Sequence, residues 1–402
     1  MKVKLLDDET KCTGCSACAN ICPQDCITMK PDEEGFLYPD INYDNCISCY
    51  KCKNICPIDK ENTTYNYDSP VFFSAKSKNK VALLNSSSGG VFYLLAEYII
   101  KQDGYVYGCI FDEEFKAIHI GVNNFENMSR MCGTKYVQSD VGNIYRDVKV
   151  RLDQNIPVLF TGTPCQIAGL NYFLSSKQYE NLFLVEVLCH GVPSPVLFQK
   201  HIKYLEYKHK GRVTLYTMRS KKKFGWGCEN RTYYEINKNG EVKGYHPLIT
   251  EYFSAFFYGI SLRPSCYICK YATPKRYADL TLGDFWGAWY KYKKSFPEGL
   301  SVVAVNNLKG LNLFKKVEEN MDIDKVTFEE ATRSNIHFRY PLSRMQQRES
   351  FYKNINKYGY KHIFLQVYFY YSNKKQILKT FYGRLFSNKL RMFIRRHILF
   401  KF

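Results

Sequence analysis

The fold of the first part of this chain is decided by one stretch, Cys12-Thr-Gly-Cys15-Ser-Ala-Cys18-Ala-Asn-Ile-Cys22-Pro23. The same arrangement of four cysteines and a proline returns 34 residues later, as Cys46-Ile-Ser-Cys49-Tyr-Lys-Cys52-Lys-Asn-Ile-Cys56-Pro57. A fixed period of this kind indicates a duplicated structural unit. Because there are only two copies, we expect a closed pair of units rather than a longer repeat array.

The spacing C-x2-C-x2-C-x3-C-P is typical of ferredoxins that bind two 4Fe-4S clusters. Three cysteines in one tight loop bind three corners of a cubane cluster, and the fourth points away and binds the other cluster. The predicted ligands of cluster one are Cys12, Cys15, Cys18 and Cys56. Those of cluster two are Cys46, Cys49, Cys52 and Cys22. Structural zinc is the alternative, but zinc sites prefer two separated C-x2-C pairs. A further thiol, Cys26, is interpreted as a packed side chain, because free cysteine is commonly buried.

The composition of the whole chain indicates a protein of several domains. Its 402 residues are too many for one ordinary core, so we expect at least two domains. The first residues are charged and contain no apolar leader, and no apolar run approaches the roughly 18 residues that span a bilayer. We therefore expect a soluble, cytoplasmic protein. In a reducing compartment, the 16 cysteines favour metal binding over disulfides.

The net charge of +19 is concentrated at the C-terminal end. Residues 1–60 hold 7 lysines and 10 acidic residues (net −3), whereas residues 336–402 hold 15 basic residues and one acid, Glu349 (net +14). Residues 361–371 and 389–399 of this tail are predicted amphipathic helices. A solvated helical pair is the favoured interpretation, and an anionic membrane surface or an acidic protein partner is the alternative. Nucleic acid is not expected, because no recognition motif accompanies the charge.

Between these ends, the sequence predicts a linker and then an α/β domain. Residues 61–85 are polar and irregular, and the linker is placed at residues 63–85. A helix is predicted over residues 91–102, and strands over residues 105–111 and 278–283. The clearest unit is a strand over 156–160, a turn over 161–164, a helix over 165–175 and a strand over 182–188. This order predicts that the two strands are parallel neighbours.

Six motifs in this part of the chain resemble the coenzyme F-420 hydrogenase/dehydrogenase beta-subunit family. They are Ser86-Ser-Ser-Gly-Gly-Val-Phe92, Thr134-Lys-Tyr-Val-Gln-Ser139, Phe160-Thr-Gly-Thr-Pro-Cys-Gln-Ile-Ala-Gly169, Cys189-His-Gly-Val-Pro-Ser-Pro195, Leu262-Arg-Pro-Ser-Cys-Tyr-Ile-Cys269 and Leu280-Thr-Leu-Gly-Asp-Phe-Trp-Gly287. The resemblance spans about residues 86–290, and residues 1–60 fit the ferredoxin domain that is often fused ahead of it. The tail beyond residue 336 is not covered.

The resemblance implies an FAD-binding α/β domain that passes electrons between iron–sulfur clusters and a two-electron partner. Members of the family include deazaflavin-dependent hydrogenase and dehydrogenase subunits and chlorophyll-cycle reductases that use ferredoxin. Similar proteins also occur near bacterial surface-polysaccharide genes. The family therefore implies a redox apparatus, an electron-donor or electron-acceptor protein such as ferredoxin, and a small-molecule substrate whose identity it does not fix.

The same motifs supply the candidate contacts to FAD: Ser88, Gly89, Gly90, Lys135, Tyr136, Gln138, Ser139, Thr161, Thr163, Gln166, Asp284, Phe285 and Trp286. The Ser-Gly-Gly turn opens a helix whose N–H groups could bind phosphate, and an ordinary serine cap is the alternative. Lys135 to Ser139 could equally be a plain strand segment. The carboxylate of Asp284 could bind a ribose hydroxyl beside two rings that cover the flavin, or it could cap a turn next to core aromatics. Since no G-x-G-x-x-G is present, a Rossmann site is not supported.

Four more cysteines indicate a third metal site. Cys165 and Cys189 each follow a strand, so parallel strands would place both at the carboxyl edge of the sheet, where α/β folds bind ligands. With the C-x2-C pair Cys266 and Cys269, they are predicted to hold a third 4Fe-4S cluster near the flavin, as in some relatives. Structural thiols, or a single reactive Cys165 at a helix N-terminus, are the alternatives. His190 is the candidate for moving protons, and a hydrogen-bonded structural histidine is the alternative.

The predicted fold is α+β, with four parts. These are a ferredoxin-like dicluster module (1–62), a linker (63–85), an α/β FAD domain (86–335) and a basic helical tail (336–402). The predicted function is an iron–sulfur flavin oxidoreductase that acts on a two-electron substrate, for example a deazaflavin or a metabolite of surface-polysaccharide synthesis. The alternative is an electron-relay subunit of a larger redox complex, and a zinc-binding structural protein is a weaker one.

Overall fold

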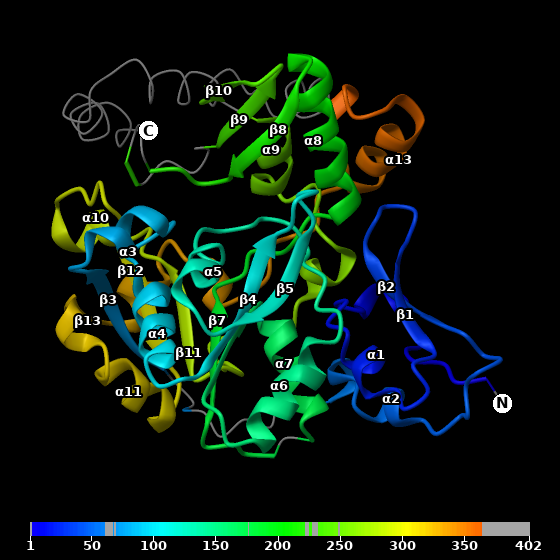
Figure 1. Cartoon of the computed structure of the whole chain (residues 1–402), viewed down its shortest axis with the longest axis horizontal. Coiled ribbons are helices and arrows are strands. Elements are labelled where there is room, and N and C mark those ends of the chain that lie inside the picture. Colours follow the sequence, from blue (N-terminus) through cyan, green and yellow to red (C-terminus); the bar gives the residue numbers. More distant parts are fainter. Residues whose placement is uncertain are drawn as a thin grey trace. The chain divides into compact units, whose positions relative to one another are not determined.

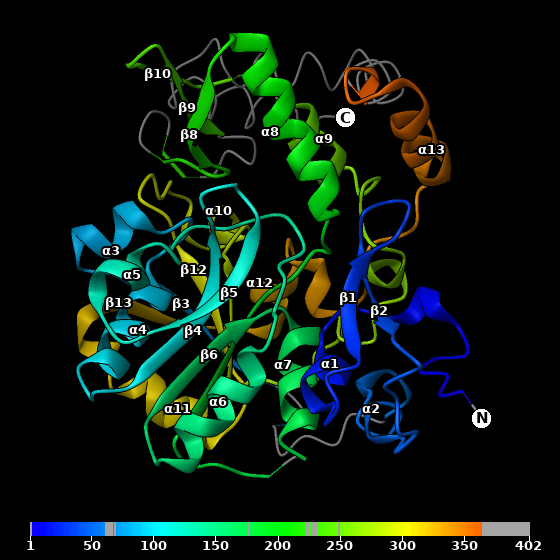
Figure 2. The same ribbon diagram turned by 45° about the vertical axis from the view of Figure 1, so that its right-hand side comes forward.

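A computed structural model describes residues 2–60, 67, 70–175, 177–221, 225–226, 232–247 and 250–363. The chain forms two units, Met1–Met345 and Gln346–Phe402. Figures 1 and 2 show the elements of the first unit from two directions. In the described part of the chain, no helix is both long enough and apolar enough to cross a membrane.

The first sixty residues form a small module of short helices and two strands (Figure 1). The elements of the module are η1 (Glu9–Lys11), α1 (Ala17–Ile21), β1 (Ile27–Pro31), β2 (Leu37–Ile41), α2 (Lys51–Asn54) and η2 (Pro57–Asp59). The helices α1 and α2 each begin after a residue in the left-handed conformation, Ser16 (φ 63°) and Tyr50 (φ 58°). Cys22 and Cys56 then continue the chain in the same extended conformation (φ −68° and −60°). The backbone therefore confirms the duplication read from the sequence.

The rest of the first unit is built on an eight-stranded mixed sheet, with strand order β13-β3-β12-β11-β7-β6-β4-β5. Its strands are β3 (Val71–Ser77), β4 (Tyr105–Phe111), β5 (Ala117–Val122), β6 (Val158–Gly162), β7 (Leu182–Val187), β11 (Leu280–Asp284), β12 (Ser301–Val305) and β13 (Met321–Val326). The central strands β11, β7, β6 and β4 are parallel, and the strands on both sides of them pair antiparallel. The predicted strand–helix–strand unit is confirmed, because α7 (Pro164–Phe173) connects the parallel strands β6 and β7.

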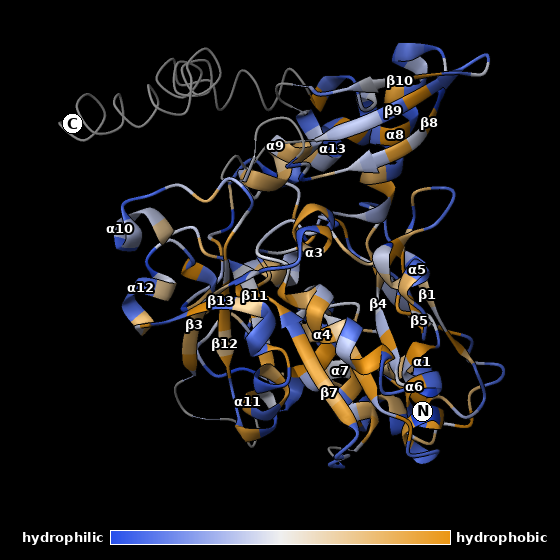
Figure 3. Ribbon diagram, turned by 60° about the vertical axis from the view of Figure 1, so that its left-hand side comes forward, coloured by the Kyte–Doolittle hydropathy of each residue, from blue (hydrophilic) through white to orange (hydrophobic). Residues whose placement is uncertain are grey.

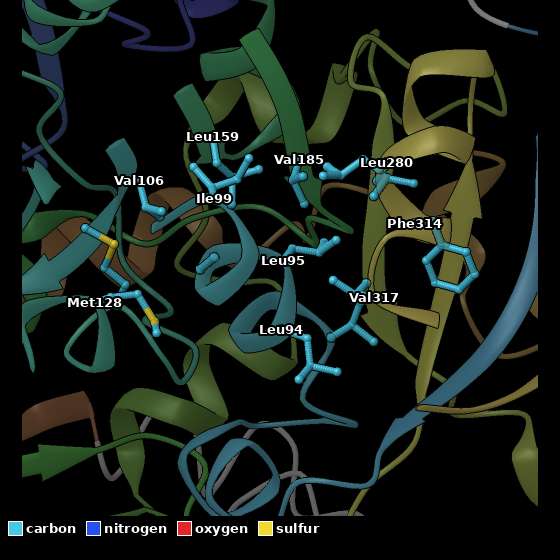
Figure 4. Close-up of a cluster of buried hydrophobic side chains, with 14 of the residues drawn as sticks. Leu94, Leu95, Ile99, Val106, Met128, Leu159, Val185, Leu280, Phe314 and Val317 are labelled. Atoms are coloured by element: carbon cyan, nitrogen blue, oxygen red, sulfur yellow. The ribbon is translucent and has the colours of Figure 1, made fainter. Parts of the chain in front are cut away.

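Helices pack on both faces of this sheet, since alternate residues of a strand point to opposite faces. Leu159 of β6 belongs to one buried cluster, and Val158 and Phe160 belong to the other. Figure 4 shows Leu95 and Ile99 of α4 (Val91–Ile100) beside strand residues of the first cluster, and Figure 3 shows that β7 is largely hydrophobic. The remaining helices around the sheet are α3 (Lys80–Asn85), α5 (Phe125–Ser129), α6 (Ile144–Asp153), η3 (Pro264–Ile268), α10 (Ala288–Tyr292), α11 (Leu308–Lys315), η4 (Glu318–Asn320), α12 (Phe328–Thr332) and η5 (Ile336–Phe338).

A smaller antiparallel sheet with order β10-β9-β8 is inserted between β7 and β11 of the chain. Its strands are β8 (Arg212–Thr217), β9 (Tyr233–Lys238) and β10 (Glu241–Tyr245), and the insertion also contains α8 (Pro195–His209) and α9 (Glu251–Phe257). The helix α8 packs on β8, where Nε2 of His201 lies 2.9 Å from the hydroxyl of Tyr216. The sequence predicted an α/β domain here but not this second sheet.

Two predicted boundaries differ from the structure. Residues 71–85 are not a linker, because β3 lies inside the large sheet between β12 and β13, and α3 follows it directly. The basic tail does not begin at residue 336, because Phe338 is buried in a core cluster and its ring packs 5.3 Å from that of Phe72. In both places, burial of aromatic side chains against residues far away in the sequence outweighs the polar local composition.

The second unit contains one helix in its described part, α13 (Arg348–Tyr358). Phe351, Tyr352 and Ile355 are its buried apolar residues, at the three- and four-residue spacing of one helix face. Gly359 ends the helix with a positive φ of 80°. The helix predicted over residues 389–399 lies outside the described residues, as does the one over 361–371 apart from residues 361–363.

The cysteine module lies beside α6 and α7 (Figure 2). The side chain of Arg146 on α6 donates hydrogen bonds to the carbonyl groups of Asn20 (2.6 Å) and Cys22 (2.8 Å), and it forms an ion pair with Asp25 (2.6 Å). Nδ2 of Asn20 in turn donates to the carbonyl of Gly142 at 2.7 Å. These contacts join the module to the part of the large sheet that carries Cys165.

Candidate functional site

The first predicted set of cysteines is brought together in the module. Burial raises the pKa of the Cys15 thiol, and the neighbouring thiols of Cys56 and Cys12 raise it further. The pKa of Cys18 is raised by burial and then by Cys15, Cys12 and Cys56. Because these thiols affect one another's pKa, the four cysteines lie in the same part of the module. This is the set predicted for cluster one.

The second predicted set lines a pocket in the same module. Cys22, Cys46, Cys49 and Cys52 all line it, together with Cys26. The sulfur atoms of Cys22 and Cys26 are 3.4 Å apart, and Cys26 is buried, in agreement with the interpretation of Cys26 as a packed thiol. Cys49 is exposed, whereas no cysteine of the first set is. Of the eight predicted ligands, Cys49 is therefore the one exposed to solvent.

The donor atoms fit iron–sulfur clusters better than single metal ions. Among the residues that the structure describes, no group of three or more His, Cys, Asp or Glu side chains is close enough to hold one ion. A cubane binds one cysteine at each of four irons, so its ligands stand further apart. Around the first set, four buried donor atoms of the described chain have no hydrogen-bond partner: Thr13 Oγ1, Gln138 Nε2, Arg263 Nη2 and Tyr271 OH. Cluster sulfur atoms accept such hydrogen bonds, so these residues fit the group.

A third group of cysteines gathers at the carboxyl edge of the parallel strands. Burial raises the pKa of the Cys189 thiol, and Cys266, Cys165 and Cys269 raise it further. A Cβ built on Gly191 would lie 3.2 Å from Cβ of Cys266, so the loop after Cys189 packs against the C-x2-C pair. Cys165 and Cys189 follow the parallel strands β6 and β7, and the segment of η3 brings Cys266 and Cys269 beside them. Their role as cluster ligands stays a prediction.

The structure argues against a single reactive Cys165. Burial raises the pKa of its thiol to about 11, although the thiol lies in the first turn of α7. Sγ of Cys165 is also 3.1 Å from Oγ1 of Thr163. A catalytic cysteine needs a lowered pKa, because the thiolate is the reactive form.

The first and third cysteine groups are neighbours. A Cβ built on Gly169 of α7, one turn beyond Cys165, would lie 3.1 Å from Sγ of Cys15. The ring of Tyr271 is buried, and its pKa is raised by burial and then by the thiols of Cys15 and Cys165. Tyr271 therefore lies near cysteines of both groups.

The residues predicted to bind the flavin phosphates are engaged with the protein itself. The N–H of Gly89 donates to Oγ of Ser301 at 2.9 Å, and Oγ of Ser88 donates to the carbonyl of Leu300 at 2.9 Å. A Cβ on Gly89 would lie 2.3 Å from the carbonyl oxygen of Ala75, so this glycine is needed for close packing. Gly90 has a positive φ of 85° and caps α4. A serine cap does not account for these contacts, because Gly90 is the N-cap residue of α4 and no side chain caps the helix there.

The candidates between residues 134 and 139 lie in an extended loop, not a strand. Nζ of Lys135 is buried and donates to the carbonyl groups of residues 131–133, the shortest bond being 3.1 Å to Gly133. The ring of Tyr136 stacks on Phe256 at 4.4 Å. Oε1 of Gln138 accepts a bond from the N–H of Leu37 at 3.2 Å, so Gln138 contacts the cysteine module.

Two separate sets of hydrogen bonds hold the candidates around the end of β6, which are Thr161, Thr163, Gln166 and Ser139. Oγ1 of Thr161 donates to the carbonyl of Tyr107 at 2.9 Å. Thr163 and Gln166 form a capping box at the start of α7, and Nε2 of Gln166 donates to Oγ of Ser139 at 2.9 Å. These contacts hold the loop that presents Cys165, so the structure gives the four residues a positioning role beside the third cysteine group.

Asp284 lies at the end of β11 within a group of charged and aromatic side chains. Its carboxylate pairs with the buried Arg219 and accepts a hydrogen bond from Nε1 of Trp226 at 2.7 Å. Trp226 stacks on Trp286 at 5.2 Å with nearly parallel rings. Phe285, by contrast, is fully buried in a core cluster, so the prediction that its ring covers a flavin is wrong.

His190 faces another histidine at the same edge. Its ring centre is 4.2 Å from that of His337. Burial lowers the pKa of His190 to about 4, and the charge of Arg219 acts in the same direction. His190 is therefore neutral at neutral pH, and its part in proton movement stays a prediction.

Sequence reasoning missed several charged residues at this edge. Arg219 and Lys221 lie outside every quoted motif, and Nζ of Lys221 donates to the carbonyl groups of Ser88 (2.8 Å) and Glu298 (2.7 Å). Glu186 and Arg276 form a fully buried ion pair next to Cys269. Arg263 stood inside a quoted motif, and its position three residues before Cys266 was the available signal.

The duplicated module and its two cysteine sets define an iron–sulfur protein. Residues 11–60 match the 4Fe-4S dicluster domain, so this module binds two 4Fe-4S clusters. Residues 157–331 match the family described as the C terminus of the beta subunit of coenzyme F420 hydrogenase/dehydrogenase. Residues 157–331 thus match this oxidoreductase family, and the 4Fe-4S dicluster domain lies on their N-terminal side.

No curated protein matches this chain. Among solved structures, it is similar to a chain of the F420-reducing [NiFe] hydrogenase complex from Methanosarcina barkeri, studied by xenon derivatization. The identity is 17%, the TM-score is 0.46, and the match covers 69% of this chain and 91% of that chain.

Proposed function

We propose that this protein is an iron–sulfur flavin oxidoreductase that transfers electrons between 4Fe-4S clusters and FAD and acts on a two-electron substrate. The observation that carries the proposal is the contact between the first and third cysteine groups. Cys15 packs on Gly169, one turn along α7 from Cys165, and Tyr271 lies near both cysteines. Such close packing suits electron transfer between two metal centres.

The third cysteine group is proposed to hold a third 4Fe-4S cluster. Cys165, Cys189, Cys266 and Cys269 supply four thiols, which is the ligand number of a cubane. The buried pair of Glu186 and Arg276 lies next to Cys269, and Oγ1 of Thr281 donates to Glu186 at 2.8 Å. These residues give the group a polar, fixed surrounding of the kind that tunes a metal site.

FAD is proposed to bind at the same carboxyl edge. When bound, FAD accepts or donates electrons singly and exchanges them with organic substrates in pairs. Lys221 supplies positive charge for its phosphates, and Trp286 supplies a flat ring surface beside the ion pair of Arg219 and Asp284. His119 lies on β5 beside the end of β6. Its Nδ1 atom is buried and has no hydrogen-bond partner in the described chain, so a polar atom of the cofactor can fill this position.

The exchange partner is proposed to be an electron-carrying protein that docks over cluster two. Cys49 is exposed there, and Ile47 and Tyr50 are exposed apolar residues next to it (61% and 39%). Lys51 lines the same pocket, and Lys53 is exposed on the same helix. This charge favours an acidic carrier, because opposite charges steer the two surfaces together.

The proposal is tested by reducing the purified chain with dithionite in the absence of oxygen and following its visible spectrum. We expect the clusters and FAD to be reduced in the wild type. In Cys189→Ser, we expect reduction of the flavin to be at least tenfold slower, while cluster one is still reduced at the wild-type rate. Cys132→Ser, a partly buried thiol outside all three groups, is the matched control and keeps the wild-type rate. Flavin reduction at the same rate in both variants would contradict the proposal.

Turnover by the isolated chain separates an enzyme from a relay subunit. We expect the reduced chain to pass electrons to a deazaflavin or another two-electron acceptor without a further protein. A chain that binds the clusters but turns over no acceptor would instead be the relay subunit of a larger complex.

A further inference from the structure

Arg263 is a completely buried cation at the junction of the cysteine module and the large-sheet domain. Its exposed fraction is 0%. Nε donates to the carbonyl of Cys12 at 2.7 Å, and Nη1 donates to Oε1 of Gln138 at 3.1 Å. The guanidinium plane lies over the ring of Tyr38 at 4.0 Å. Arg263 therefore contacts the loop of cluster one on one side and the large-sheet domain on the other.

Within the part of the chain that the structure describes, no carboxylate forms an ion pair with Arg263. None of the ion pairs formed within the described chain includes Arg263, and its Nη2 atom is buried without a hydrogen-bond partner. Burying an unbalanced charge is costly, so buried arginines are normally paired. Arg276, the other fully buried arginine at this edge, is paired with Glu186. The anion that balances Arg263 is therefore not a carboxylate of the described chain.

The position of Arg263 indicates which anion this is. Arg263 donates a hydrogen bond to the carbonyl of Cys12, a predicted ligand of cluster one. A Cβ on Gly14 of the same loop would lie 3.2 Å from Nη1 of Arg263. A 4Fe-4S cluster with four thiolate ligands carries net negative charge. Burial raises the pKa of the Cys165 and Cys266 thiols, and the charge of Arg263 acts in the opposite direction, so Arg263 is also near the third group.

The segment from Arg263 to Lys270 binds the module at both of its ends. Cys266 and Cys269 lie between these two cations. At the far end, Nζ of Lys270 donates to the carbonyl of Pro57, which follows the cluster-one ligand Cys56, at 2.8 Å. One short segment thus holds cluster one from two sides and carries two cysteines of the third group.

We propose that Arg263 is a positioning residue for electron transfer between the module and the large-sheet domain. Its guanidinium is the counter-charge of cluster one, raises the reduction potential of that cluster, and holds the Cys12 loop against the segment that carries Cys266 and Cys269. The counter-charge and the raised potential need only the two clusters of the dicluster domain. The contact with the segment of Cys266 and Cys269 matters for electron transfer only if the proposed function holds, so this part rests on the proposed function. A fixed positive charge favours the reduced cluster, because reduction adds an electron.

The test is a redox titration followed by EPR on the full chain with its clusters. Cys49→Ser identifies the signal of cluster two, so the remaining module signal belongs to cluster one. In Arg263→Gln, we expect the one-electron equilibrium of cluster one to shift at least tenfold towards the oxidised form, about 59 mV. Arg263→Lys keeps the charge and is expected to recover most of this shift. Gln138→Glu keeps Arg263 and supplies a carboxylate of nearly the same shape, so it lowers the potential even if Arg263→Gln fails to load iron.

Arg146→Gln is the matched control, because Arg146 also binds backbone carbonyl groups of the module but lies on the side of Cys22. We expect it to leave the potential of cluster one unchanged. An unchanged cluster-one potential in both Arg263→Gln and Gln138→Glu would overturn the inference. A wild type that binds only about eight irons would remove the third cluster and the proposed function, but the shift in cluster one would still be expected.

Discussion

Gly169 of α7 lies so close to Cys15 of the module that a Cβ at this glycine would be 3.1 Å from the sulfur atom. The same Cβ would be 2.9 Å from the hydroxyl of the buried Tyr145. Alanine normally favours a helix interior by about 1 kcal/mol over glycine. In Gly169→Ala we expect the opposite, because the methyl group pushes the cluster-one loop away from α7. The measurements are the denaturant midpoint and the iron content per chain, and both should fall. A more stable variant with full iron content would show that this contact is not needed.

Ile47→Asp should weaken the contact with a protein electron carrier. The side chain of Ile47 is 61% exposed beside Cys49, and a carboxylate there repels an acidic partner. We expect reduction by an acidic ferredoxin to slow about tenfold, while reduction by dithionite is unchanged. Leu84→Asp is the matched control, because Leu84 is 68% exposed on α3 and belongs to the large-sheet domain. Equal rates for the two variants would argue against docking over cluster two.

Glu186→Gln should be strongly destabilising. It leaves Arg276 charged and buried, and removing one partner of a buried pair costs about 3–5 kcal/mol. Lys149→Ala breaks an exposed pair with Asp153 and should cost less than about 1 kcal/mol. Urea unfolding of the two variants measures the difference. Similar losses of stability would mean that the pair of Glu186 and Arg276 is more solvated than the structure indicates.

His201 should make the protein less stable in mild acid. Burial lowers its pKa from 6.5 to about 3, and the charge of Lys208 acts in the same direction. Between these values the unfolded chain binds a proton that the folded chain does not, so stability falls as the pH falls through 6.5. From pH 7 to pH 5, the wild type should lose about 2 kcal/mol more than His201→Gln. Denaturant unfolding at the two pH values checks this, and parallel losses would exclude His201 as the cause.

The duplicated module and the strand–helix–strand unit were predictable because their signals are local. The cysteines repeat at a fixed spacing, and Pro164 marks the start of α7 between two apolar strands. The strand β3 was missed because its partners, β12 and β13, lie more than two hundred residues later in the chain. Its alternating burial arises only when that sheet has formed.

The gathering of Cys165 and Cys189 followed from the rule that parallel strands end at one edge. The surroundings of this edge did not follow, because an arginine in a sequence is normally read as exposed. Only the structure shows that Arg263 is buried, that no carboxylate of the described residues pairs with it, and that Arg219 pairs with Asp284. The prediction that the ring of Phe285 covers a flavin failed because the turn after β11 directs this ring into the core.

The most direct test of the account is the iron and flavin content of the chain, purified without oxygen and measured with its visible spectrum. The account predicts about twelve iron atoms and one FAD per chain, because three groups of four cysteines each hold a 4Fe-4S cluster. About eight iron atoms and no flavin would contradict it, since Cys165, Cys189, Cys266 and Cys269 would then hold no cluster.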